Sequence, residues 1–154
     1  MAQGFAAAFE EAVLRIELAF AEAVEEVLES AKTHLEEFAP VGREGNSTNP
    51  PGDLKDSMVI EGPVGGDGVF TGSVGPTAVS AWDGVTEYGH FRDVGGTLIA
   101  HNDSGLMTFT IDGNIYRKSI VVQEGAHYVA AAYEATEPEV DDIVARYLAE
   151  AIEE

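Results

Sequence analysis

The segment APVGREGNSTNPPGDLKDSM, residues 39–58, separates a long helical pattern from a β-rich one. The residue before a proline is pushed out of the helical region of backbone space, so Pro40 ends the helix that precedes it. Beyond Pro40 the segment is mainly glycine, proline, asparagine, serine and threonine, with little to bury. This composition predicts a loop over residues 40–53. We expect the first β-strand to begin directly after the loop, at Leu54.

Residues 1–39 are predicted to form one long helix. From Phe5 to Ala39 there is no glycine or proline, and alanine is abundant. Apolar residues recur mostly at intervals of three and four, which places them on one helix face: Phe9, Val13, Ile16, Phe20, Val24, Val27, Ala31, Leu35 and Phe38. Such a helix would be about 50 Å long at ~1.5 Å per residue, longer than a domain of this size needs. Part of the face is expected to meet another subunit; the alternative is a helix lying across its own sheet.

Residues 54–124 are predicted to be rich in β-strand. Residues 69–74 are expected to pair with the first strand across a glycine-rich turn. Residues 107–111 alternate apolar and polar side chains, and Asp-Gly-Asn at 112–114 predicts a tight turn into a partner strand over residues 115–122. Between these pairs, a short helix or loop is expected over residues 82–88, followed by irregular chain.

Residues 127–154 are predicted to be helical. Thr136 and Glu139 have the spacing of a capping box, so we expect the helix proper to begin at Thr136, with Pro138 tolerated in its first turn. The order helix, strands, helix predicts an α+β fold in one domain over residues 1–154. A long N-terminal helix and a C-terminal helix would then pack on a mostly antiparallel sheet.

The charge of the chain is strongly negative, with 28 acidic and eight basic residues and a net charge of −20. The excess is spread along the chain: −7 over residues 1–39, −6 over residues 40–133 and −7 over residues 134–154. Such a chain should repel nucleic acid and anionic lipid. One interpretation is solubility; the other is a surface that lies near DNA without binding it. No apolar run of ~18 residues is present, so no membrane partner is expected.

Motifs for catalysis or cofactor binding are absent from the sequence. It contains no phosphate-binding loop, no dinucleotide fingerprint, no nucleophile elbow and no cysteine. Glu87 and His90 could share a metal on one helical turn, but Gly89 lies between them and no third ligand is implied. We therefore expect no enzyme activity, no catalytic residue, no cofactor and no metal. Trp82, the sole tryptophan, is either an interface anchor or a half-buried aromatic at the rim of the core.

A series of short motifs gives the chain a resemblance to a known family. A long helix ends in Ala39-Pro40, a loop leads to Gly-x-Leu-x-x-Ser at residues 52–57, and Glu-Tyr-Gly follows at residues 87–89. Tyr128 then leads into the last helix. This order resembles the neck and tail-completion proteins of long-tailed bacteriophages, the minor tail-component, head–tail joining family. The chain departs from the family pattern in its longer loop after Pro40, at Trp82-Asp83, and at His90 and His127.

The resemblance implies a structural virion protein of the phage neck or tail, made in the cytoplasm of the bacterial host. Its partners would be copies of itself in a homo-oligomeric ring, which we expect to be six-fold, and the neighbouring connector, head-closure and tail-tube proteins. Packaged DNA would pass through an acidic lumen without adhering. The alternatives are a tail-terminator ring of the same joint and an acidic module that mimics DNA. The residues predicted to form subunit interfaces are Phe9, Ile16, Phe20, Leu54, Ser57, Trp82, Glu87, Tyr88, Gly89 and Tyr116.

Overall fold

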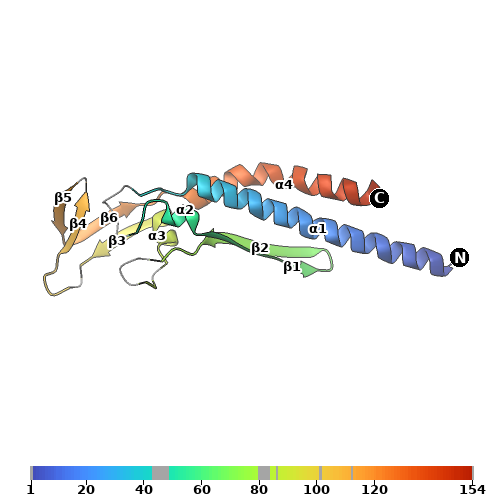
Figure 1. The fold of residues 1–154 in the computed structure, drawn as a ribbon, viewed down its shortest axis with the longest axis horizontal. Coiled ribbons are helices and arrows are strands. Elements are labelled where there is room, and N and C mark those ends of the chain that lie inside the picture. Colours follow the sequence, from blue (N-terminus) through green and yellow to red (C-terminus); the bar gives the residue numbers. More distant parts are fainter. Residues whose placement is uncertain are drawn as a thin grey trace. The chain divides into compact units, whose positions relative to one another are not determined.

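The computed structural model describes residues 2–42, 49–79, 84–85, 87–100, 102–111 and 113–153 (Figure 1). The chain divides into two compact units. Unit 1 comprises residues 1–34, 60–74 and 133–154, and unit 2 comprises residues 35–59 and 75–132. Long terminal helices combine with small antiparallel sheets, which confirms the predicted α+β class. The single domain predicted over residues 1–154 stays a prediction.

The described part of the chain forms the following helices and strands, each set given in chain order. The helices are α1 (Ala2–Phe38), α2 (Asp53–Asp56), α3 (Gly89–Val94) and α4 (Tyr128–Glu153). The strands are β1 (Met58–Gly66), β2 (Val69–Pro76), β3 (Gly95–Ile99), β4 (Met107–Ile111), β5 (Asn114–Lys118) and β6 (Ile120–Glu124). The strands described form three two-stranded sheets, β1–β2, β3–β6 and β4–β5. Among the described residues, no helix is long and apolar enough to span a membrane.

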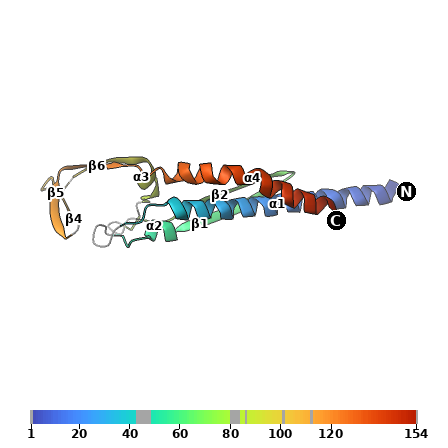
Figure 2. The same ribbon diagram turned by 90° about the horizontal axis from the view of Figure 1, so that it is seen from above.

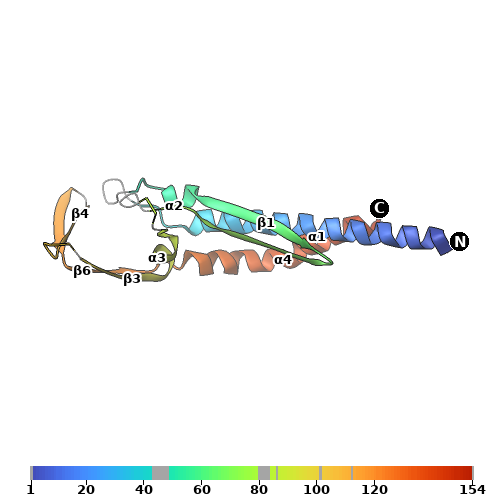
Figure 3. The ribbon, with the colours of Figure 1, turned by 90° about the horizontal axis from the view of Figure 1, so that it is seen from below.

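Helix α1 confirms the helical prediction for the N-terminal segment and ends at Phe38, two residues before Pro40. In unit 1 the β1–β2 hairpin runs along α1 (Figure 3). The hairpin turns at Asp67 and Gly68, whose φ angles of 52° and 78° are both positive. Two positive φ angles are typical of the tight turn whose twist matches the flanking strands. This hairpin was predicted.

The core of unit 1 lies around α1. Ala19 and Ala23 are 5% and 1% exposed, and Leu28 is 7% exposed. Leu28 lies against Gly72 of β2, where a Cβ atom would come within 2.4 Å of Leu28 Cδ1. From α4, Ile143 is 8% exposed and belongs to the same core. The absence of a side chain at Gly72 leaves room for the side chain of Leu28.

Helix α4 agrees with the helical prediction for residues 127–154, but it does not begin at Thr136. The capping-box prediction at Thr136 is wrong, because the helix already starts at Tyr128 and Thr136 is a buried residue inside it. A threonine followed three residues later by a glutamate also occurs on one face within a helix, so the spacing alone does not place the start. Pro138 is therefore an interior helix residue. Its ring crowds the carbonyl group one turn earlier, and it has no N–H to donate.

In unit 2, β3 and β6 run antiparallel, with Gly95 opposite Glu124 and Ile99 opposite Ile120 (Figure 2). Strands β4 and β5 form the predicted second hairpin, with Met107 opposite Lys118. The predicted turn residue Asp112 lies outside the described residues.

Three strand and helix predictions in unit 2 are wrong. The strand expected to begin at Leu54 is preceded by the short helix α2, because Gly52 turns the chain at φ 85° and the strand begins only at Met58. The strand expected over residues 115–122 is split at Ser119 into β5 and β6, which pair with different partners. The irregular chain expected after residue 88 is α3 followed by β3. Of the helix or loop expected over residues 82–88, residues 84–85 and 87–88 are described, and they are not helical.

Replacement of Pro138 by alanine is expected to stabilise the protein. The change restores an N–H donor and removes the ring from the helix interior, a gain of about 3 kcal/mol, less up to ~1 kcal/mol for the freer unfolded chain. Urea denaturation followed by circular dichroism should show an increase of roughly 2 kcal/mol in the free energy of unfolding. An unchanged or lower value would show that the helix tolerates the proline at no cost.

Candidate functional site

The two motifs of the sequence come together in unit 2. Leu54 is 3% exposed, and Gly89 is buried. Tyr128, which is 1% exposed, donates a hydrogen bond from its hydroxyl group to the carbonyl oxygen of Gly89 at 3.2 Å. The first residue of α4 is thereby joined to the first residue of α3. We call Leu54, Pro76, Gly89 and Tyr128 the motif junction.

The motif junction requires glycine at position 89. A Cβ atom there would lie 2.4 Å from Cγ of Pro76, 3.3 Å from the hydroxyl oxygen of Tyr128 and 3.4 Å from Cδ1 of Leu54. A proline ring has no side-chain rotamer that would move it away from the added atom. The glycine therefore serves close packing between segments that are distant in sequence.

A hydrogen-bond network flanks the motif junction. The hydroxyl group of Tyr88 donates to Oδ2 of Asp53 at 2.9 Å. The amide nitrogen of Asn49 donates to the same oxygen at 2.8 Å and to the carbonyl oxygen of Val79 at 2.7 Å. Burial, followed by the hydrogen bond to Asp53, raises the pKa of Tyr88 to about 12. The network ties the end of the predicted loop to Val79 and Tyr88, which both lie after β2 in the chain.

Ser57, the last residue of the Gly-x-Leu-x-x-Ser motif, closes α2. Its hydroxyl group donates to the carbonyl oxygen of Leu54 at 2.8 Å. Its own carbonyl oxygen accepts hydrogen bonds from the backbone N–H and the hydroxyl group of Thr77, both at 3.0 Å. The motif thus fixes the start of β1 to the residue that follows β2.

Four of the predicted interface residues, Leu54, Ser57, Tyr88 and Gly89, have their described contacts inside unit 2. Their structural role explains the motif without a second subunit, and their role in an interface stays a prediction. Glu87 is exposed and forms a β-bridge with Val79. Trp82 lies outside the described residues.

Sequence reasoning did not single out Asp53 or Pro76 as members of this arrangement. Asp53 lies beside the motif glycine, in a stretch without periodicity, and its partner Tyr88 is distant in sequence. Pro76 is the last residue of β2 and has no motif of its own. The contacts of both residues depend on tertiary folding, which leaves no local signal.

The predicted interface residues of α1 differ in exposure. Phe9 is 62% exposed, whereas Ile16 and Phe20 are partly buried. The ring of Phe5, which is 76% exposed, stacks on the ring of Phe9 with the centroids 6.5 Å apart. The apolar stripe is thus exposed at Phe9 and Val13, partly buried from Ile16 onward and buried at Leu35, while Phe38 at its end is 42% exposed.

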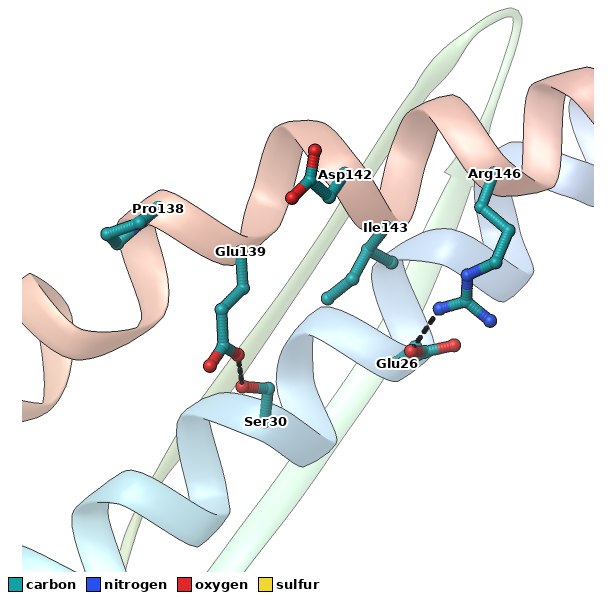
Figure 4. Close-up of a pocket in the computed structure, with 7 residues that line it drawn as sticks. All are labelled: Glu26, Ser30, Pro138, Glu139, Asp142, Ile143 and Arg146. Carbon is teal, nitrogen blue, oxygen red and sulfur yellow. Dashed lines mark hydrogen bonds and ion pairs between the residues drawn. The ribbon is translucent and has the colours of Figure 1, made fainter.

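A groove lies between α1 and α4 in unit 1 (Figure 4). It has a volume of about 390 Å³ and is open to solvent along its length. From α1, Glu26 hydrogen-bonds and ion-pairs with Arg146, and the hydroxyl group of Ser30 donates to Glu139. The remaining lining residues are Pro138, Asp142 and Ile143. The groove has three carboxylates against one guanidinium group, and its contacts hold the two helices together.

The carboxylates of this groove are hydrogen-bonded in the folded state. The hydrogen bond from Ser30, and then that from His34 at 3.2 Å, hold the pKa of Glu139 below its usual value. Hydrogen bonds from Tyr147 and Arg146 likewise lower the pKa of Glu26. Both carboxylates stay ionised at neutral pH, which makes them acceptors in helix packing and poor proton donors.

Two further predictions concern exposed residues of unit 2. Glu87 and His90 are both exposed, and the described part of the chain contains no group of three or more histidine, aspartate or glutamate side chains placed to hold a metal ion. Tyr116 of β5 is 40% exposed and lies opposite Phe109. The next two residues of the strand, Arg117 and Lys118, are also exposed.

No family model, curated protein or solved structure matches this chain. A functional proposal therefore depends on the residues and contacts of the chain itself. They show a packed motif junction, an exposed apolar helix face and a strongly acidic surface.

Replacing Gly89 by alanine should destabilise the protein by about 1–3 kcal/mol, the usual cost of overpacking a filled site. The matched control is Gly75→Ala, because Gly75 lies beside Pro76, would have no atom within 4 Å of an added Cβ and has no positive φ. Thermal denaturation of both variants, followed by circular dichroism, separates the steric effect from the loss of a glycine. Equal melting temperatures for the two variants would contradict the packing role of Gly89.

The phenol of Tyr88 should remain protonated well above its ordinary pKa of 10.0. Because the pKa in the folded protein is the higher one, the contribution to stability is complete below pH 10 and is lost as the pH rises through 12. NMR titration of ¹³Cζ-labelled tyrosine, with Tyr88→Phe for assignment, measures this value. In Asp53→Asn the Tyr88 pKa should fall but stay above 10.0, since burial contributes most. A Tyr88 resonance that titrates at the ordinary value in the parent protein would contradict the network.

Proposed function

We propose that this chain is a structural virion subunit that forms a ring at the head–tail junction of a long-tailed bacteriophage. The chain would act by contact with copies of itself and with the connector and tail proteins on either side. The observation that carries the proposal is the exposed apolar surface at the beginning of α1. The order of motifs in the sequence supplies the phage assignment.

The exposed surface of α1 comprises Phe5, Phe9, Val13, Leu14 and Leu18, which are 76%, 62%, 40%, 65% and 59% exposed. Large side chains in such an arrangement mark an interaction surface more often than a free one. At about 100° per residue, the first three lie on one side of the helix and the two leucines roughly 160° away. Apolar surface on two sides of one helix suits a subunit that has a neighbour on each side.

The charge along α1 favours contact at the same place. Residues 2–20 carry three acidic and one basic residue, whereas residues 21–38 carry six acidic and one basic residue. Copies of a −20 chain repel one another, and the repulsion is weakest where the local charge is lowest. The weakly charged part of the helix is therefore also the apolar part, which supports a contact between copies there.

The acidity of the chain supports passage of DNA through such a ring. Binding of phosphates depends on basic side chains that displace counterions. With 28 acidic against eight basic residues, a lumen made of this chain would repel DNA and let it slide. A tail-terminator ring at the same joint would have the same requirement and remains the alternative within this proposal.

The uneven charge of the two units favours one alternative from another class. Unit 1 contains 17 acidic and three basic residues, so it carries −14 of the total of −20. An acidic module that mimics DNA would use such a surface to occupy the basic cleft of a DNA-binding protein. Tight, salt-sensitive binding to such a protein, with no incorporation into virions, would favour this alternative.

The double substitution Phe5→Ser and Phe9→Ser tests the proposal in a phage that encodes the chain. Particles assembled with the variant should accumulate as filled heads and separate tails, as should particles without the chain, because the ring does not close. Electron microscopy of lysates and immunodetection of the chain in purified virions give the readout. Val85→Ser, which changes a 77% exposed valine of unit 2, is the control and should leave virions intact.

Normal infectious particles in the absence of the chain would overturn the proposed function. Normal particles that contain the Phe5 and Phe9 variant would remove the apolar surface of α1 from the argument. Circular dichroism of the purified variant verifies that the change has not unfolded the helix.

A further inference from the structure

The β4–β5 hairpin differs in charge from the rest of the chain. Residues 107–118 contain Arg117 and Lys118 against the single acid Asp112, so the segment is positive within a chain of −20. On β4, the residues opposite Arg117 and Lys118 are Thr108 and Met107, neither of which is a carboxylate. Neither basic side chain forms an ion pair with a residue that the structure describes. Because consecutive strand residues point to opposite faces, each face of the hairpin presents one exposed cation to a partner.

The hairpin is also incompletely packed. Within the described residues its two strands pair only with each other, so neither outer edge is covered by a further strand. A two-stranded sheet alone is marginally stable in water and gains stability from packing against another element. Ile115, on the same strand face as Arg117, is 70% exposed, and Tyr116, on the face of Lys118, is 40% exposed. Each face therefore combines an apolar side chain with a cation.

Unit 1 has the complementary charge. Its net charge of −14 contrasts with −6 for unit 2, which holds the hairpin. On α4, Glu134 and Asp141 are exposed and lie seven residues apart, so they share the helix face that points away from the buried Ile143. Neither carboxylate forms an ion pair with a described residue.

We propose that the β4–β5 hairpin of one copy binds the acidic outer face of α4 in unit 1 of a second copy. The inference rests on the proposed ring function and names the surfaces that would join its subunits. DNA is a poor alternative occupant, because a phosphate backbone near two cations would face a net charge of −20 on the rest of the chain. A copy of the same chain offers both carboxylates and apolar surface.

The proposed contact is heterologous, because hairpin and helix are different surfaces of each copy. Each subunit would then contact one neighbour through its hairpin and the other neighbour through its α4 face. Such contacts repeat from copy to copy, and they close into a ring when the rotation between neighbours permits. A symmetric dimer would not result from this pairing.

Charge reversal tests the pairing in the full-length chain. Arg117→Glu with Lys118→Glu should abolish incorporation of rings into virions, as should Glu134→Lys with Asp141→Lys. A mixture of the two variants should restore assembly, because each supplies the surface that the other lacks. Misfolding of either variant would give no recovery on mixing. The single changes Lys118→Glu and Lys55→Glu alter the net charge equally on two exposed lysines of unit 2, and only the first should reduce assembly.

Disulfide crosslinking gives an independent readout, since the chain has no cysteine. A variant with Lys118→Cys and Asp141→Cys should give a ladder of dimers, trimers and larger products after mild oxidation of virions. Each single-cysteine variant should give no ladder. Reduction should return the products to single chains.

Different results overturn different parts of the argument. Unaffected rings with Arg117→Glu and Lys118→Glu, or crosslinked products that stop at dimers, would overturn the hairpin proposal and leave the ring function standing. Absence of the chain from virions would overturn both. Salt-sensitive binding of the purified chain to double-stranded DNA, lost in the hairpin variant, would assign the hairpin to nucleic acid and would also overturn the proposal.

Discussion

The contact between Gly89 and Tyr128 is the constraint on which unit 2 depends. The tyrosine hydroxyl group donates to the glycine carbonyl oxygen, and Pro76, Tyr128 and Leu54 leave no room for a Cβ atom at position 89. Four segments that are distant in sequence thus meet at one point: α2, the end of β2, α3 and the start of α4. The Gly-x-Leu-x-x-Ser and Glu-Tyr-Gly motifs, on which the resemblance to a family was based, each contribute a residue to this packing.

The small side chains of the core help to explain why many large apolar side chains are exposed. Five of the buried apolar residues described are alanines, Ala19, Ala23, Ala39, Ala78 and Ala132. A core of small side chains lets elements approach closely but removes less apolar surface from water per residue. Larger side chains such as Phe5, Ile115 and Val122 are left exposed. In a monomer this is surplus apolar surface, whereas in an assembly it would supply the interfaces.

The parts predicted well from sequence are those governed by local patterns. The apolar repeat of α1 depends on neighbouring residues, and the helix was found as expected. The hairpin of β1 and β2 was also found, but β1 extends to Gly66, so the glycine-rich connection expected over residues 62–68 is reduced to a turn at Asp67 and Gly68. The failures concern pairings between distant segments. Strand β3 begins with two glycines and has no clear alternation, and its identity comes from β6, more distant along the chain. The start of α4 was hidden because an alanine-rich segment precedes a threonine–glutamate pair with capping spacing. The candidate surfaces follow the same division: the stripe on α1 was visible in the sequence, whereas the partners of Asp53 and Gly89 were not.

The single residue between β5 and β6 has a mechanical consequence. Ser119 alone separates a strand that belongs to one sheet from a strand that belongs to another, and its carbonyl oxygen accepts a hydrogen bond from the N–H of Ala100 at 2.9 Å. Any swing of the β4–β5 hairpin relative to the β3–β6 ladder must be taken up on the β5 side by the backbone torsions around this residue. The backbone torsions of Ser119 therefore control the orientation of the hairpin relative to the β3–β6 ladder. A force on the hairpin would act on the hydrogen bond between Ala100 and Ser119.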